Sequence, residues 1–200
     1  YVLTAYYSRT KNKEMQTLYQ SPERLVEIYK CFNFDFSEQA GLVMVVPFKV
    51  KKWLDSRITA IGFRYRQKDS DFWDIRFDRK LYTFVLTMNN TFTLSTKPDL
   101  KFTLSGFYQN KAIQGIFDLP RSGNLDAALR YTFAKGKAQL TLKCDDIFNT
   151  STISTNVRFG QQNVKNHYMK TTRAFGISFN YKFGGYKEKK REEVDTSRFK

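Results

Sequence analysis

Apolar and polar residues alternate along several stretches of the chain, which is the pattern of a β-strand with two different faces. The clearest stretch is 174–183, where Phe175, Ile177, Phe179, Tyr181 and Phe183 share one face. Similar alternation occurs over 81–89, 124–133 and 137–146, and weaker alternation over 1–9, 39–48, 53–66 and 100–112. The best helix candidate, 21–29, is short and lies between strands. The pattern predicts an all-β protein with about eight strands.

The predicted connections between these strands alternate between long and short. The long ones are 10–37, 67–79, 113–122 and 148–170, and the short ones are 49–52, 96–99 and 135–136. A transmembrane β-barrel has this organisation, with short periplasmic turns and long extracellular loops. Strands of about ten residues also suit a tilted membrane span. We therefore expect an antiparallel transmembrane β-barrel segment.

The two faces of the strongest strands differ in chemistry. One face is aliphatic in the middle and aromatic near the short turns, as in the pairs Tyr131 with Phe133 and Tyr181 with Phe183. Aromatic residues gather in this way at membrane interfaces. The opposite face is polar, and we expect it to line a watery lumen. The predicted lumen-facing residues are Asp126, Arg130, Gln139, Lys143, Ser178 and Lys182.

The chain is strongly basic, with 34 Lys and Arg against 19 Asp and Glu and a formal net charge of +15. Such a balance can indicate nucleic-acid binding. Here the basic residues are spread along the chain without one dominant stripe, so no nucleic-acid partner is expected. Attraction to lipopolysaccharide phosphates, or a positive path for anionic ligands, explains the charge better.

Residues for enzyme chemistry are scarce. His167 is the single histidine, and Cys31 and Cys144 are the only cysteines, which we expect not to pair. Asp145 and Asp146 are adjacent and would point to opposite faces of a strand, so they cannot form a catalytic dyad. No nucleophile elbow, phosphate-binding glycine loop or metal-ligand spacing is present. We predict no catalytic residue, no metal and no cofactor. A helical membrane protein is excluded too, because no run of about 18 apolar residues exists.

Four segments form one continuous pattern, namely Leu104-Ser105-Gly106-Phe107-Tyr108-Gln109, Ile113-Gln114-Gly115, Leu125-Asp126-Ala127-Ala128-Leu129-Arg130-Tyr131 and Asp146-Ile147-Phe148-Asn149-Thr150. This pattern resembles the C-terminal barrel portion of TonB-dependent receptors, in the outer-membrane β-barrel subgroup common in Bacteroidetes. The resemblance runs from Tyr1 to about Gly185. It implies a location in the Gram-negative outer membrane and a barrel with about twice as many strands. It also implies a plug and a TonB-contacting segment, both N-terminal to this chain.

We accordingly expect residues 1–185 to be the C-terminal part of a larger barrel, and 186–200 to be a charged periplasmic tail. The expected function is TonB-dependent uptake of a ligand that the sequence does not identify. Two other interpretations stay open. One is a passive porin or structural barrel without TonB coupling, and the other is a soluble β-sheet binding module.

The last strand also resembles the C-terminal signal read by the barrel-assembly machinery. Gly176, Phe179, Tyr181 and Phe183 carry this resemblance. The match departs from the usual pattern at Ala174, where a polar residue is common, and in the chain that continues beyond Phe183. The expected partners are thus the barrel-assembly machinery, outer-membrane lipid and lipopolysaccharide, and TonB through the N-terminal part of the receptor.

Overall fold

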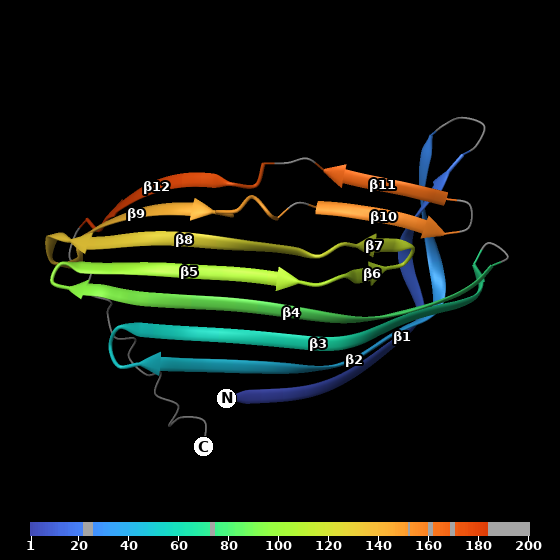
Figure 1. The fold of residues 1–200 in the computed structure, drawn as a ribbon, viewed down its shortest axis with the longest axis horizontal. Helices are drawn as coiled ribbons and strands as arrows, with labels where there is room; N and C mark the ends of the chain where they lie inside the picture. The colour runs from blue at the N-terminus through green and yellow to red at the C-terminus, as the bar shows by residue number, and fades with distance from the viewer. Residues whose placement is uncertain (22–25, 73–74, 152, 160–161, 169–170, 184–200) are drawn as a thin grey trace, which may run out of the picture.

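One long antiparallel sheet dominates the computed structural model, which describes residues 1–21, 26–72, 75–151, 153–159, 162–168 and 171–183. Its strands, in spatial order, are β1 (Val2–Gln20), β2 (Glu27–Val50), β3 (Leu54–Phe72), β4 (Ile75–Thr96), β5 (Asp99–Gln109), β8 (Ser122–Phe133), β9 (Ala138–Asp145) and β12 (Ala174–Tyr181). Each of these eight strands pairs with its neighbour in an antiparallel meander (Figure 1). The prediction of an all-β chain with about eight main strands is confirmed. Among the described residues, no helix has the length and apolar character needed to cross a membrane.

The long connections differ from the prediction, because they are mostly strands and not irregular loops. β1 and β2 extend far into 10–37 from either side, and β3 and β4 continue through most of 67–79. A second sheet, in the order β11 (Gln162–Tyr168), β10 (Ile153–Phe159), β7 (Phe117–Leu119) and β6 (Ala112–Gln114), fills the other two connections. Apolar residues are sparse in most of these segments, so the alternation that marks a strand is weak there, although a few of them are buried in a core. Backbone pairing still forms hairpins. In the best helix candidate, 21–29, residues Glu27–Tyr29 belong to β2, and 22–25 lie outside the described residues.

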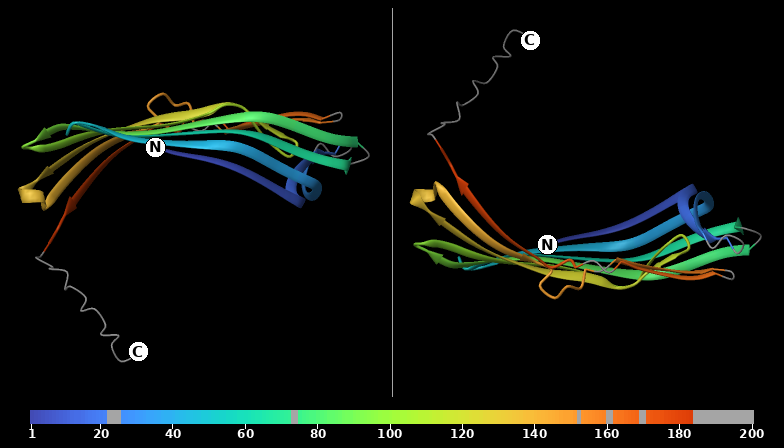
Figure 2. Two further views of the ribbon diagram at one scale, coloured as in Figure 1. Left: turned by 90° about the horizontal axis from the view of Figure 1, so that it is seen from below. Right: turned by 90° about the horizontal axis from the view of Figure 1, so that it is seen from above.

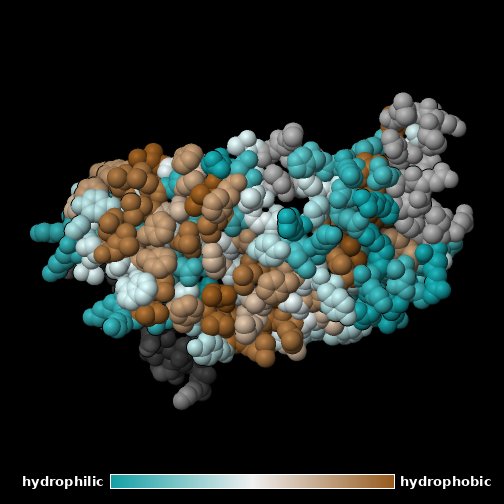
Figure 3. All heavy atoms as spheres, in the orientation of Figure 1, coloured by the Kyte–Doolittle hydropathy of each residue, from teal (hydrophilic) through white to brown (hydrophobic). Residues whose placement is uncertain are grey.

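The three short turns are confirmed and lie together at one end of the sheet (Figure 1). They are the turn after Val50, the turn at Lys97-Pro98 and the 3-10 turn η1 (Ala134–Gly136). The hairpins lie at the other end, which we call the hairpin end. The sheet is curved but open, with β1 and β12 as its edges (Figure 2). The convex face is turned toward the viewer in Figures 1 and 3.

Strand pairing places an apolar set of side chains on the convex face. It includes Leu42, Met44, Ile58, Leu86, Met88, Leu104, Leu129, Leu142 and Ile177. On β4 this apolar band extends from Phe92 to Tyr82, about 34 Å along the strand and about 25 Å in height once strands are tilted. Two polar residues interrupt it, and they satisfy each other, since the Ser56 hydroxyl donates to Asn90 Oδ1 at 2.6 Å. Figure 3 shows the band ending in hydrophilic surface toward the hairpin end.

Aromatic rings line the convex face near the short turns. Trp53 stacks on Phe92 with ring centroids 6.0 Å apart, and Phe92 lies 6.1 Å from Phe102. The row continues through Tyr131, Phe133, Phe179, Tyr181 and Phe183. Trp and Tyr side chains are favoured at a membrane surface, because their apolar rings contact lipid while their polar groups reach water. The predicted aromatic row next to the short turns is therefore present.

The buried core lies at the hairpin end and not in the middle of the sheet. It consists of Met15, Leu18, Phe34, Phe77, Ile116 and Val157. The ends of β1 and β2 farthest from the short turns bend onto the concave side (Figure 2), where they meet residues of β4, β7 and β10. Phe34 and Phe77 pack with ring centroids 4.9 Å apart. This core joins hairpins that are far apart in the sequence into one unit.

Candidate functional site

The residues predicted to face a lumen share the concave face of the sheet. Arg130 on β8 lies opposite Thr141 on β9, and Thr141 lies opposite Ser178 on β12. Alternation places Asp126, Gln139 and Lys143 on the same face. Lys182 follows β12 and extends its pairing, because its backbone N–H donates to Lys137 O at 2.8 Å. The polar set is thus brought together, while its role as a lumen lining stays a prediction.

The four residues that resemble a barrel-assembly signal lie on both faces of β12. Phe179, Tyr181 and Phe183 are exposed on the convex side, with Phe183 87% exposed. Gly176 lies on the concave side beneath the Lys143 side chain, and a Cβ there would come within 2.7 Å of Lys143 Cε. β12 has one free edge, which suits strand addition by another protein. The signal role stays a prediction.

A hydrogen-bond network centred on Asp146 fixes the path from β9 into the β10–β11 hairpin. Its carboxylate, in a residue only 3% exposed, accepts bonds from the backbone N–H of Thr150 at 3.0 Å and of Ser151 at 2.9 Å. It also accepts a hydrogen bond from the hydroxyl of Thr172, which lies just before β12. The Asp146 N–H donates to Asp126 Oδ1 at 2.7 Å. One aspartate therefore joins both ends of the hairpin to β8.

The protonation of Asp146 follows from these contacts. Burial would raise the pKa of the carboxyl, but the hydrogen bonds from Thr172, Thr150 and Ser151 outweigh burial and hold the pKa below its usual value. Asp146 and Asn149 both adopt a positive φ, 45° and 55°, which aspartate and asparagine tolerate better than most residues. The segment Asp146–Thr150, quoted for the resemblance, thus has a structural reason for its residue types.

A second network fastens the β6–β7 hairpin to β3 and β4. The buried Gln67 side chain accepts a bond from Gly115 N–H at 2.7 Å and donates to the sulfur of Met15. Arg79 donates to Gly115 O at 3.2 Å and forms an ion pair with Asp118. Gly115 has a positive φ of 59°, a conformation that glycine adopts without strain. The hairpin position is accordingly set by side chains and does not depend on its short strands alone.

These networks leave a cleft of about 360 Å³ between β4 and the second sheet. It opens because β5 ends at Gln109, which is opposite Val85, so β4 has no β5 residue beside it beyond this point and stays paired with β3 alone. The lining residues are Arg79, Lys80, Leu81, Lys111, Ala112, Ile113, Asp118, Leu119, Pro120, Asn156 and Arg158. We call this the cationic cleft, because four cations face one carboxylate.

The charges of the cationic cleft are unbalanced. Asp118 is engaged by Arg79. Within the described part of the chain, no carboxylate forms an ion pair with Lys80, Lys111 or Arg158. An anionic ligand would supply the missing partners through charge-assisted hydrogen bonds. The sequence pattern did not reveal this site, because its residues come from four separate segments.

Comparison with known proteins now identifies the family. The sequence model described as the outer membrane protein beta-barrel family matches residues 1–181. The chain belongs to this outer membrane protein beta-barrel family. Searches of curated proteins and of solved structures find no match.

The protein is therefore an outer-membrane β-barrel protein, located in the cell outer membrane. In such barrels the lipid-facing side is apolar and flanked by aromatic residues, as the convex face is here. Short turns are periplasmic and long connections extracellular in bacterial barrels. By this rule, the hairpin end and the cationic cleft belong on the extracellular side.

Sites for metals or disulfides are not found in the ranges that the structure describes. No group of three or more His, Cys, Asp or Glu residues there is arranged to hold a metal ion. Cys31 and Cys144 are both free thiols, so the prediction that they do not pair is confirmed.

Proposed function

We propose that this outer-membrane barrel protein is the C-terminal wall of a TonB-dependent receptor, and that its hairpins capture an anionic ligand in the cationic cleft. The observation that carries the proposal is the cleft itself, with three cations that lack ion-pair partners among the described residues. The resemblance of the Gly115 and Asp146 segments to TonB-dependent receptors supports it. A ligand class follows from the charge, namely small molecules that bear carboxylate or phosphate groups.

The structure explains how such a site would be held ready. Gln67 and Arg79 fix the β6–β7 hairpin, and Asp146 fixes the β10–β11 hairpin. Binding groups on fixed elements lose less conformational entropy when a ligand binds. In the proposed receptor, TonB acts through the N-terminal part of the protein, and the barrel-assembly machinery inserts the wall. No catalytic step is proposed.

The experiment measures whether the cleft and TonB serve the same uptake. Strains lacking the full-length protein, and strains lacking TonB, are grown on a panel of organic acids and phosphorylated sugars as sole nutrients. We expect one nutrient on which both strains grow poorly. The variant Lys111→Gln with Arg158→Gln should reproduce this defect with normal protein levels, whereas Lys135→Gln with Lys137→Gln, at a short turn, should grow as wild type.

A passive porin is the second candidate, and the polar concave face around Arg130 and Lys143 favours it. The two are separated by conductance of the purified full-length protein in planar lipid bilayers. A TonB-dependent receptor should stay closed, because its plug fills the lumen. Steady ionic conductance, with growth that does not depend on TonB, would support the passive porin and refute the receptor.

A further inference from the structure

A second basic surface lies on the convex face, directly beyond the apolar band. One cross-strand row runs from Arg9 on β1 through Glu38 and Arg66 to Lys80 on β4. The next row, farther toward the hairpin end, contains Lys11, Phe36, Lys68 and Asp78. Arg64 lies one row closer to the apolar band, beside Tyr82. We call these residues the cationic collar.

The collar keeps a net positive charge after its internal pairs are counted. Its cations are Arg9, Lys11, Arg64, Arg66, Lys68 and Lys80, and its carboxylates are Glu38 and Asp78. Arg66 bonds to both carboxylate oxygens of Asp78, at 2.8 and 2.6 Å. Glu38 lies 3.8 Å from Arg64 and 3.9 Å from Arg66. The carboxylates thus hold the two central arginines in place and neutralise only part of the charge.

The outer cations of the collar are presented to the surroundings. The Arg9 guanidinium lies 4.1 Å from the centre of the Phe36 ring, which supports it without neutralising it. Lys11 and Lys80 are exposed, and no described carboxylate forms an ion pair with Lys11, Lys68 or Lys80. A row of cations without ion-pair partners, next to lipid-facing residues, attracts anionic lipid headgroups.

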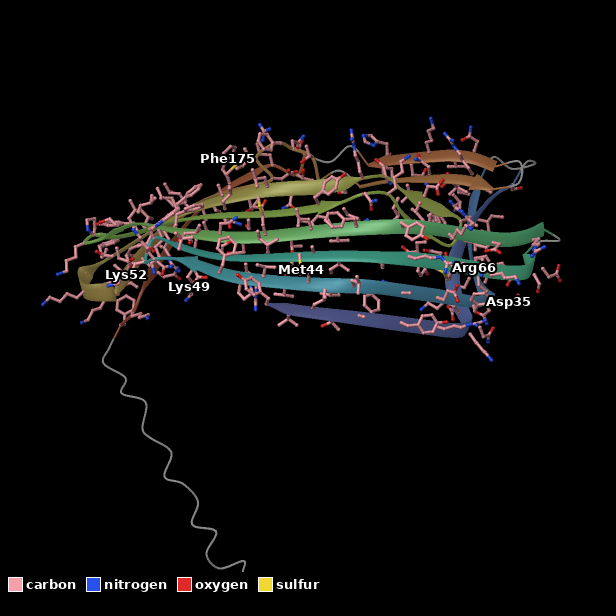
Figure 4. The ribbon with its side chains drawn as sticks, turned by 60° about the horizontal axis from the view of Figure 1, so that its bottom comes forward. Asp35, Met44, Lys49, Lys52, Arg66 and Phe175 are labelled. Atoms are coloured by element: carbon pink, nitrogen blue, oxygen red, sulfur yellow. The ribbon has the colours of Figure 1, made fainter. Side chains whose placement is uncertain are left out.

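The depth of the collar indicates which anion is available. Lys80 lies two residues beyond Tyr82, about 7 Å along the strand from the edge of the apolar band. Figure 4 shows the order along the sheet, with Lys49 and Lys52 at the short-turn end, Met44 between, and Arg66 toward the hairpin end. The collar therefore faces the headgroup layer of the leaflet on the hairpin side. It shares Lys80 with the cationic cleft and no other residue.

We propose that the cationic collar binds the phosphate groups of lipopolysaccharide in the outer leaflet. Phosphates on a lipid-anchored sugar headgroup sit at the boundary between apolar and polar layers, where the collar lies. Several phosphates can contact several strands at once, because neighbouring strands are about 4.8 Å apart. The inference rests on the outer-membrane location and the strand pairing, and not on the proposed receptor function.

The test compares two matched variants of the full-length protein. The collar variant carries Arg9→Gln, Lys11→Gln and Lys68→Gln, which avoids the cleft and the Arg66–Asp78 pair. The control carries Lys51→Gln, Lys52→Gln and Lys97→Gln in the short turns, with the same loss of charge. Lipid A that co-purifies with folded protein is measured by mass spectrometry. Binding of lipid A and of phosphatidylglycerol to protein in lipid nanodiscs is then titrated.

We expect the collar variant to retain at least threefold less lipid A than wild type, and the control to retain a normal amount. Replacing the same three residues with arginine or lysine counterparts (Arg9→Lys, Lys11→Arg, Lys68→Arg) should preserve binding, which separates charge from a folding defect. Equal retention by the collar variant and wild type overturns the proposal. Loss of lipid A from the short-turn control alone also overturns it. So does a collar variant that loses phosphatidylglycerol binding as much as lipid A binding, because the collar would then be a general anion-binding surface.

Discussion

Gly41 and Gly62 lie on neighbouring strands, but only Gly41 lacks room for a side chain. A Cβ at Gly41 would lie 2.6 Å from both Gly62 O and Phe63 Cβ, whereas a Cβ at Gly62 would meet nothing within 4 Å. Gly41→Ala should therefore lower barrel stability by about 1–3 kcal/mol, the usual cost of overpacking. Gly62→Ala should stay near wild type. Samples heated to increasing temperatures and run on gels show the temperature at which the folded band disappears. Equal loss of stability in the two variants would contradict the strand pairing.

Asp146 should make the β10–β11 hairpin sensitive to acid. Its pKa is lowered in the folded state, so its stabilisation is present above the ordinary aspartate pKa and is lost as pH falls through the lower, folded value. Cleavage of the hairpin by pepsin, which acts in acid, should then rise over this pH range before the barrel unfolds. In Asp146→Asn, cleavage should already be fast at the upper end of that range and vary little with pH. A wild-type hairpin with no such rise would show that Asp146 does not hold it.

At the scale of elements, β12 provides the sharpest test of which face meets lipid. Ile177 pairs across from Leu142 on the convex face, and Ser178 pairs across from Thr141 on the concave face. An arginine near the middle of the lipid face costs about 2–4 kcal/mol, whereas a wet lumen can hydrate it. Ile177→Arg in the full-length protein should thus reduce folded barrel clearly more than Ser178→Arg.

The matched pair also controls for assembly, because neither substitution alters Gly176 or the aromatic residues of the predicted assembly signal. Folded protein in outer-membrane fractions, measured from unheated gels, gives the answer. If the two variants give equal amounts of folded barrel, or if Ser178→Arg gives less, then the convex face of β12 does not contact lipid.

For the whole molecule, the two ends of the sheet have different structural demands. The short-turn end is held by local turns and an aromatic row, and needs no buried core because lipid covers the convex face. The hairpin end extends into water, where apolar side chains are stabilised only by packing on one another. The core around Phe34 and Phe77 supplies this packing and brings the hairpins together. Hairpins held in place in this way suit the ligand capture proposed above.

The sequence by itself determined the eight main strands, their two faces and the short turns, because alternation and turn chemistry are local properties. It also carried the segments that resemble TonB-dependent receptors. The second sheet was missed because its strands have only 3 or 7 residues and few apolar positions, so their alternation is too short to recognise. Only the tertiary structure decided which distant residues meet: Met15 packs in one core with Val157, and Lys80 shares a cleft with Arg158. Such contacts depend on how hairpins fold over the sheet, and a local pattern cannot encode that placement.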